Sequence, residues 1–65
     1  MKPFQERVVQ EKADLDERLA KLNAFGQSDA FSTLPPEEQE RLKKQSRLMD
    51  QYSVVLSERI AAFVQ

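Results

Sequence analysis

The positions of the helix breakers constrain this chain more than any other feature of its sequence. The only glycine is Gly26, and two of the three prolines stand together at residues 35 and 36. Nothing interrupts a helix between Pro3 and Gly26, or after the double proline. Gly26 directly follows the first apolar pattern, so we expect it to end that helix in the left-handed conformation. The sequence therefore predicts helices at about residues 3–25 and 36–63, joined by a connection over residues 26–35.

The double proline starts the second helix. Proline suits the first turn of a helix, because the N–H that it lacks has no acceptor there. Glu37, Glu38 and Glu40 follow at once, and carboxylates favour the positive end of the helix dipole. The connection keeps Phe31 and Leu34, which a solvated linker would not carry. We expect a tight connection with one helical turn, whose Phe31 folds back onto the core.

Both predicted helices carry an apolar stripe with the spacing of one helix face. The first stripe consists of Phe4, Val8, Leu15, Leu19 and Leu22. The second stripe is wider and covers more than about 100° of the helix circumference. Its apolar members are Leu42, Leu48, Met49, Val55, Leu56, Ile60 and Phe63. Together the two stripes are the predicted core and oligomer interface.

The short connection predicts that the two helices run antiparallel. If Leu22 meets Leu42, Lys12 lies near Tyr52. One partner helix cannot cover the wide second stripe, and a chain of 65 residues has only a marginal core of its own. We therefore predict an all-α fold: one domain over residues 1–65, an antiparallel two-helix hairpin that assembles into a homo-oligomeric helical bundle.

Composition and charge exclude several classes of protein. The 10 basic and 11 acidic residues are intermixed and leave a net charge of −1, so no positive field attracts duplex nucleic acid or an anionic membrane. No apolar run approaches the roughly 20 residues of a membrane span. The N-terminus lacks the apolar segment of a signal peptide. We expect a soluble intracellular protein.

The sequence offers little for catalysis or metal binding. It has no histidine, no cysteine and no glycine-rich phosphate loop, which leaves carboxylates and lysines on solvated helix faces. The Glu-x-x-His pairs of a di-metal bundle are lacking. We predict a protein that is not an enzyme and has no catalytic residue, metal site or cofactor. The basic residues of RLKKQSR wrap around the helix, so we expect a solvated surface, with a docking patch as the alternative.

Polar residues interrupt both stripes at Lys12, Gln45, Tyr52 and Arg59. One interpretation is structural: Lys12 extends its ammonium past the contact between the two helices, Tyr52 keeps its hydroxyl at the edge of the bundle, and Gln45 fixes the register of the helices. The other is functional: Lys12, Tyr52 and Arg59 come together across subunits and form a ligand-binding pocket for an anion or nucleotide. The sequence leaves both interpretations open.

The run LPPEEQERLKKQ, followed by Met49, Tyr52 and Arg59, resembles small helical-hairpin proteins of tailed phages and prophages, including relatives of the crAss-like phages. The likeness extends from FQERVVQEK to SVVLSERIAAF. A weaker resemblance is to the phage anti-CBASS and anti-Thoeris hairpin sponges, small oligomers that sequester nucleotide immune signals at subunit interfaces. This sequence lacks their short extra N-terminal helix, and its tyrosine lies in the second long helix, so no binding residue is carried over from them.

These resemblances imply a phage protein in the cytoplasm of a bacterial host cell. Its expected function is anti-defence ligand binding, as a homo-oligomeric nucleotide sponge whose partners are itself and a cyclic nucleotide or ADP-ribose-type signal. The alternative is a helical protein–protein interaction module that docks on a host or phage protein. A third candidate is a purely structural accessory.

Overall fold

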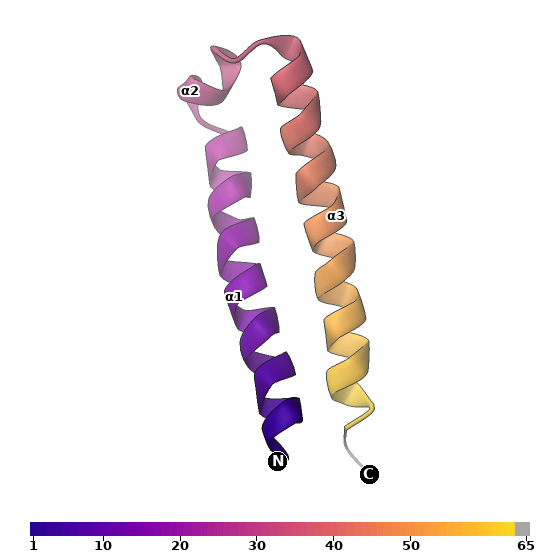
Figure 1. Cartoon of the computed structure of the whole chain (residues 1–65). Coiled ribbons are helices and arrows are strands. Elements are labelled where there is room, and N and C mark those ends of the chain that lie inside the picture. Colours follow the sequence, from indigo (N-terminus) through magenta and orange to yellow (C-terminus); the bar gives the residue numbers. More distant parts are fainter. Residues whose placement is uncertain (64–65) are drawn as a thin grey trace.

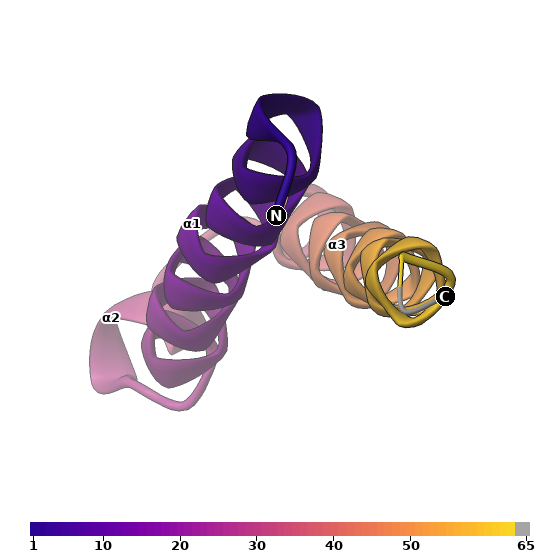
Figure 2. The same ribbon diagram turned by 90° about the horizontal axis from the view of Figure 1, so that it is seen from below.

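The computed structural model describes residues 1–63 and is helical, with two long helices side by side in opposite directions (Figure 1). Helix α1 spans Pro3–Gly26, the short helix α2 spans Asp29–Ser32, and helix α3 spans Pro36–Ala61. The predicted two-helix hairpin is therefore confirmed. Seen along the hairpin, α1 lies against one side of α3 and leaves much of the circumference of α3 facing outward (Figure 2).

Helix α1 ends differently from the expectation for Gly26. This glycine is the last residue of α1 and does not adopt a positive φ, so the predicted left-handed conformation is wrong. The backbone N–H of Gln27 donates to the carbonyl of Ala24, and that of Ser28 donates to the carbonyl of Phe25. The Ser28 hydroxyl also donates to the Phe25 carbonyl, at 2.6 Å. These bonds close the helix end without a left-handed residue.

The connection is ordered by its own side chains. Ser28 caps α2, because its Oγ accepts a hydrogen bond from the Phe31 N–H at 3.3 Å. Phe31 packs edge-to-face against Phe25, with ring centroids 6.0 Å apart. The Gln39 side-chain amide donates to the Leu34 carbonyl at 2.9 Å and joins the connection to the first turns of α3. The connection therefore contains the expected helical turn and positions Phe31 over the end of α1.

The core of the hairpin is small. Its buried apolar side chains are Val8, Leu15 and Leu56, and partly buried Met49, Ile60 and Phe63 pack against them. At the open end Phe63 meets Phe4 edge-to-face, with centroids 5.9 Å apart. A core of this size leaves only a small margin of stability.

Three residues of the predicted core and oligomer interface are about half exposed on the single hairpin. They are Phe4, Leu48 and Val55. The other members of the two predicted stripes are buried or partly buried: Val8, Leu15, Leu19, Leu22, Leu42, Met49, Leu56, Ile60 and Phe63. Leu48 and Val55 thus contribute little to the core between α1 and α3, and their role as interface residues stays a prediction.

Candidate functional site

The three predicted ligand residues come from two helices, Lys12 from α1 and the other two from α3. Lys12 reaches into the seam between α1 and α3 and contacts Ser53. Tyr52 and Arg59 are exposed on the outside of α3, Arg59 in its last turn. Within one hairpin, therefore, the hydrogen-bond partners of Lys12 are Asp16 and Ser53, and neither Tyr52 nor Arg59 is among them.

Lys12 belongs to a polar cluster with Asp16 and Ser53. The Lys12 ammonium lies 2.6 Å from Asp16 Oδ2 and donates to Ser53 Oγ at 3.0 Å. The buried Ser53 hydroxyl in turn donates to Asp16 Oδ1. Lys12 thus contacts Ser53, the residue after Tyr52, in place of the expected Tyr52. Successive residues point about 100° apart around a helix, so Ser53 is buried against α1 while the Tyr52 ring is exposed.

The cluster keeps the Asp16 carboxylate charged. The hydrogen bond from the Lys12 ammonium lowers the pKa of Asp16 most, and the bond from the Ser53 hydroxyl lowers it further. Partial desolvation raises this pKa, and the positive charge of Lys12 adds a smaller lowering effect. Because 45% of the Asp16 side chain is exposed, water screens the pair and its contribution to stability is modest. The cluster satisfies its own polar groups and fixes the register of α1 on α3.

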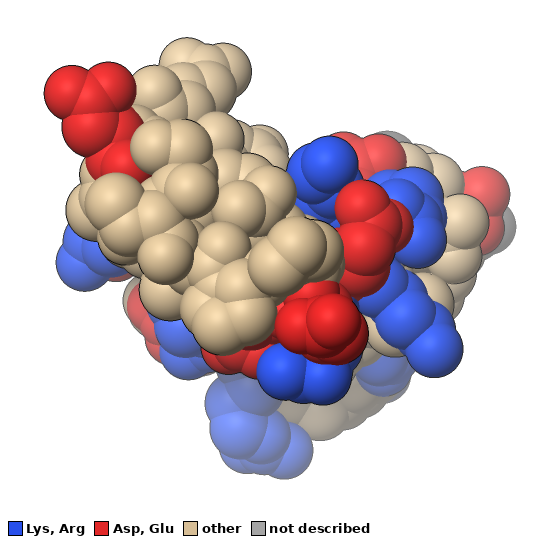
Figure 3. Space-filling view, turned by 90° about the horizontal axis from the view of Figure 1, so that it is seen from above, with Lys and Arg blue, Asp and Glu red and all other residues tan. Residues whose placement is uncertain are grey.

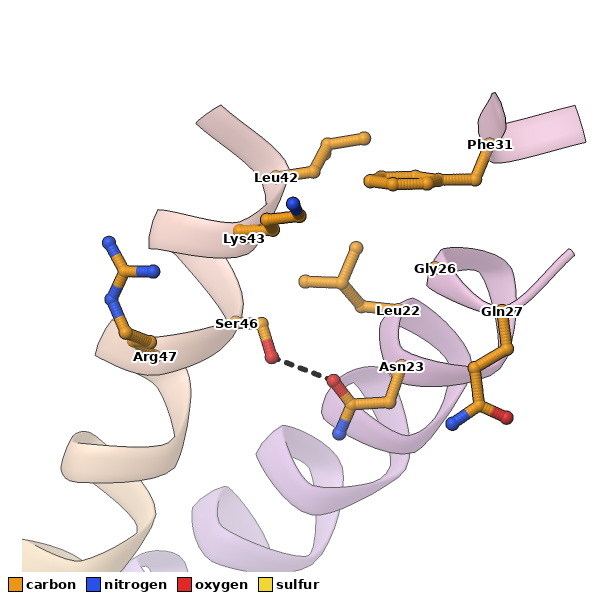
Figure 4. A pocket seen from close by; sticks show the side chains of 9 residues that line it. All are labelled: Leu22, Asn23, Gly26, Gln27, Phe31, Leu42, Lys43, Ser46 and Arg47. Atoms are coloured by element: carbon orange, nitrogen blue, oxygen red, sulfur yellow. Dashed lines mark hydrogen bonds between the residues drawn. The ribbon is translucent and has the colours of Figure 1, made fainter. Parts of the chain in front are cut away.

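A second candidate site is an open hollow at the connected end of the hairpin. The hollow has a volume of about 440 Å³ and lies between the end of α1, α2 and the first half of α3. The side chains of Leu22, Phe31 and Leu42 converge on it from these three helices (Figure 4). Its other lining residues are Asn23, Gly26, Gln27, Lys43, Ser46 and Arg47.

The lining combines an apolar wall, amides and cations. The Ser46 hydroxyl donates to Asn23 Oδ1 at 2.7 Å, which leaves the amide N–H₂ of Asn23 for other acceptors. Lys43 is held only loosely, since its ammonium is 3.5 Å from Glu40 Oε1 and half of its side chain is exposed. Arg47 has no ion-pair partner within residues 1–63. The hollow can therefore receive a flat apolar group against Phe31 and an anionic group beside Lys43.

Charges around the connected end are otherwise mixed. Viewed from above, Lys and Arg side chains alternate with Asp and Glu side chains, and neither sign forms a continuous patch on this face (Figure 3). This agrees with the net charge of −1. Any preference for anions on this face therefore depends on individual cations such as Lys43 rather than on a broad positive field.

A family model described as Sequestin matches residues 2–62. The chain belongs to the Sequestin family. The match includes α1, α2 and α3, so it covers both the polar cluster and the hollow. Neither the curated proteins nor the solved structures contain a match to this chain. None of the helices in residues 1–63 is long and apolar enough to cross a membrane.

Reasoning from the sequence missed two features of this Sequestin-family hairpin. Ser53 continues the inner face of α3 at four residues from Met49 and three from Leu56, a spacing that could have revealed it. The sequence carries a weaker signal for the hollow, because the hollow forms only when Phe31 folds over the end of α1. The sequence predicts a solvated basic segment at Lys43, whereas its position beside Phe31 depends on that fold of the connection.

Proposed function

We propose that this protein is a non-enzymatic, homo-oligomeric binding protein of phage origin that counters host antiviral defence by sequestering a nucleotide immune signal. Two lines support the proposal: the Sequestin family, whose name denotes sequestration, and the resemblance to phage hairpin sponges. The observation that carries it is the hollow, which places an aromatic ring, two amides and loosely held cations around one volume in a chain of this family.

The chemistry of the hollow suits a nucleotide. Its volume of about 440 Å³ falls within the roughly 300–1,000 Å³ of typical small-molecule sites. A base can stack against Phe31, and the amide N–H₂ of Asn23 can donate to its polar edge. Lys43 can bind a phosphate directly, and the longer Arg47 side chain can reach over the rim. A cyclic nucleotide or an ADP-ribose derivative contains both kinds of group.

The ligand thus has two candidate positions. One is the predicted interface pocket with Lys12, Tyr52 and Arg59, and the other is the hollow with Lys43. A ligand that binds Lys12 must displace or share the Asp16 carboxylate, which already contacts the ammonium at 2.6 Å. A ligand that binds Lys43 competes only with a distant Glu40 carboxylate. For this reason we favour the hollow as the main binding position.

Calorimetric titration with a panel of cyclic nucleotides and ADP-ribose derivatives tests the proposal. We expect one compound to bind tightly, and Lys43→Met to weaken its binding about tenfold, since a charge-assisted hydrogen bond contributes roughly 1.5–3 kcal/mol. Lys21→Met is the matched control, because Lys21 is 75% exposed on α1 and lies outside the hollow. The compound released by denaturing the complex should be chemically unchanged, as sequestration without catalysis requires.

The same titration distinguishes the two positions. If Tyr52→Leu and Arg59→Met weaken binding and Lys43→Met does not, the ligand occupies the predicted interface pocket instead of the hollow. A panel without any binder would contradict the nucleotide proposal. It would then favour the alternative of a helical protein-interaction module, which is supported by the exposed apolar side chains on the outside of α3.

A further inference from the structure

Helix α3 carries an apolar stripe that α1 does not cover. Leu48, Tyr52 and Val55 are 55%, 44% and 49% exposed. Gln45 and Arg59 continue this stripe at its two ends, so its members follow one another at steps of three, four, three and four residues. This alternation is the spacing of a seam between two packed helices. We call Gln45, Leu48, Tyr52, Val55 and Arg59 the outer seam.

The outer seam is separate from the face that α3 turns toward α1. That inner face contains Met49, Ser53, Leu56 and Ile60, which are buried or partly buried. Successive residues differ by about 100° around a helix, so the two faces lie roughly a quarter turn apart. Each helix of a four-helix bundle uses two faces at about this angle to contact its two neighbouring helices. One hairpin supplies only one of those neighbours (Figure 2).

We propose that the outer seam packs against the outer seam of a second copy of this chain, with the two α3 helices antiparallel, to form a four-helix bundle. The inference rests on the proposed function only in that the latter already takes the protein to be a homo-oligomer. It adds the surface and the orientation of the copies. It also gives Tyr52 and Arg59 a role between subunits that requires no ligand.

The charges beside the outer seam favour this orientation. Lys44, Gln51 and Glu58 follow one another at seven-residue steps along the edge of the seam that faces away from α1. In an antiparallel pair these edges meet, so Lys44 lies opposite Glu58 of the second copy, twice by symmetry, with Gln51 near the centre. Neither Lys44 nor Glu58 has an ion-pair partner within the described chain. The seam is thus charge-complementary to itself when antiparallel.

A parallel pair lacks this complementarity. There the edge with Lys44 and Glu58 would meet the opposite edge of the second copy, which carries the uncharged Met49 and Leu56. The two α1 helices would also lie on opposite sides of the α3 pair. In the antiparallel pair both α1 helices lie on the same side, so the two small cores join into one bundle core.

Sedimentation equilibrium of two neighbouring variants tests the seam. Val55→Glu places a charge in the outer seam, whereas Val54→Glu places it on the other side of α3, at a residue that is equally exposed, 52%. We expect the unmodified protein and Val54→Glu to dimerise at micromolar concentration, and Val55→Glu to raise the dimer dissociation constant at least tenfold. Circular dichroism checks that both variants remain helical. Equal behaviour of the two variants, or a monomeric parent protein, would overturn the proposal.

A charge exchange keeps the test valid if Val55→Glu fails to fold. Lys44→Glu and Glu58→Lys lie on exposed positions, and each alone should weaken dimerisation several-fold, because it places like charges opposite each other. The double variant Lys44→Glu with Glu58→Lys should restore it. Single variants that leave dimerisation unchanged, or a double variant that fails to recover it, would contradict the antiparallel pairing.

Distances between nitroxide labels determine the orientation directly. The chain has no cysteine, so Glu40→Cys or Gln51→Cys introduces a single label in each copy. In the antiparallel pair the two labels at residue 51 are close together, while those at residue 40 are separated by about 20 residues along the axis, or roughly 30 Å. A parallel pair gives two similar short distances and would overturn the antiparallel orientation. These measurements need no nucleotide, so they can succeed even where the titration finds no ligand.

Discussion

At the scale of single residues, one polar cluster joins α1 to α3 beside the apolar core. Ser53 is the only buried polar residue in the described chain, and its hydroxyl serves both Lys12 and Asp16. A buried polar group is costly without partners, so this cluster disfavours a register that buries Ser53 away from Lys12 and Asp16. It takes the place of the Lys12–Tyr52 contact that the sequence predicts.

Removing the Ser53 hydroxyl should therefore destabilise the hairpin. Ser53→Ala removes one hydrogen bond to Asp16 and one from Lys12, and we expect the free energy of unfolding to fall by about 1 kcal/mol. Ser57→Ala is the matched control, because Ser57 is exposed on the same helix, and it should change stability very little. Urea denaturation measures both variants. Equal stability of the two would mean that the Ser53 hydroxyl contributes nothing to the fold.

The lowered pKa of Asp16 predicts that the stability of the hairpin decreases at acidic pH. The folded state favours the charged carboxylate, so its stabilising contribution is complete above the pKa of the unfolded chain, about 4, and is lost as the pH falls through the lower folded value. We expect the parent protein to lose more stability below about pH 4 than Asp16→Asn does. Urea denaturation at a series of pH values compares the two, and parallel curves would contradict the prediction.

At the scale of elements, the sequence predicts the hairpin because its helix signals are local. Pro36 starts α3 through its own ring geometry, and the apolar stripes require only helical spacing. What depends on contacts between elements was not predictable. Ser28 ends α1 in place of a left-handed Gly26, and the fold of Phe31 over α1 creates the hollow. Assigning every apolar residue of α3 to one wide stripe also concealed its two separate faces.

The two faces of α3 should respond differently to the same substitution. Leu56 is fully buried against α1, so Leu56→Ala should cost on the order of 2–5 kcal/mol at any protein concentration. Leu48 is 55% exposed on the single hairpin, so Leu48→Ala should cost little when the protein is dilute and more when it dimerises. Urea denaturation at low and high concentration measures both. A large loss for Leu48→Ala in dilute solution would place it in the core of the hairpin.

At the scale of the whole molecule, the single hairpin is too extended for a self-sufficient domain. It measures 48 × 14 × 14 Å, and its radius of gyration is 14.9 Å, against about 11 Å for a compact domain of this length. Its accessible surface is 4967 Å², against about 4,200 Å² for a typical monomer of 7.5 kDa. The excess surface includes the outer seam, which a second copy would cover.

Thermal unfolding should therefore depend on protein concentration. Dilution favours separated hairpins, and separated hairpins retain only the small core of Val8, Leu15 and Leu56, so the unfolding temperature should fall as the concentration falls. A tenfold change in concentration alters the free energy by up to about 1.4 kcal/mol, which corresponds to a shift of at most roughly 6–11 °C for a domain of this size. Circular dichroism melts over two decades of concentration measure how the unfolding temperature changes with concentration.

Val54→Glu should keep this concentration dependence, and Val55→Glu should lose it and unfold near the temperature of the dilute parent protein. An unfolding temperature that is constant with concentration in the parent protein would mean that the hairpin is stable alone, and it would contradict the pairing of two outer seams.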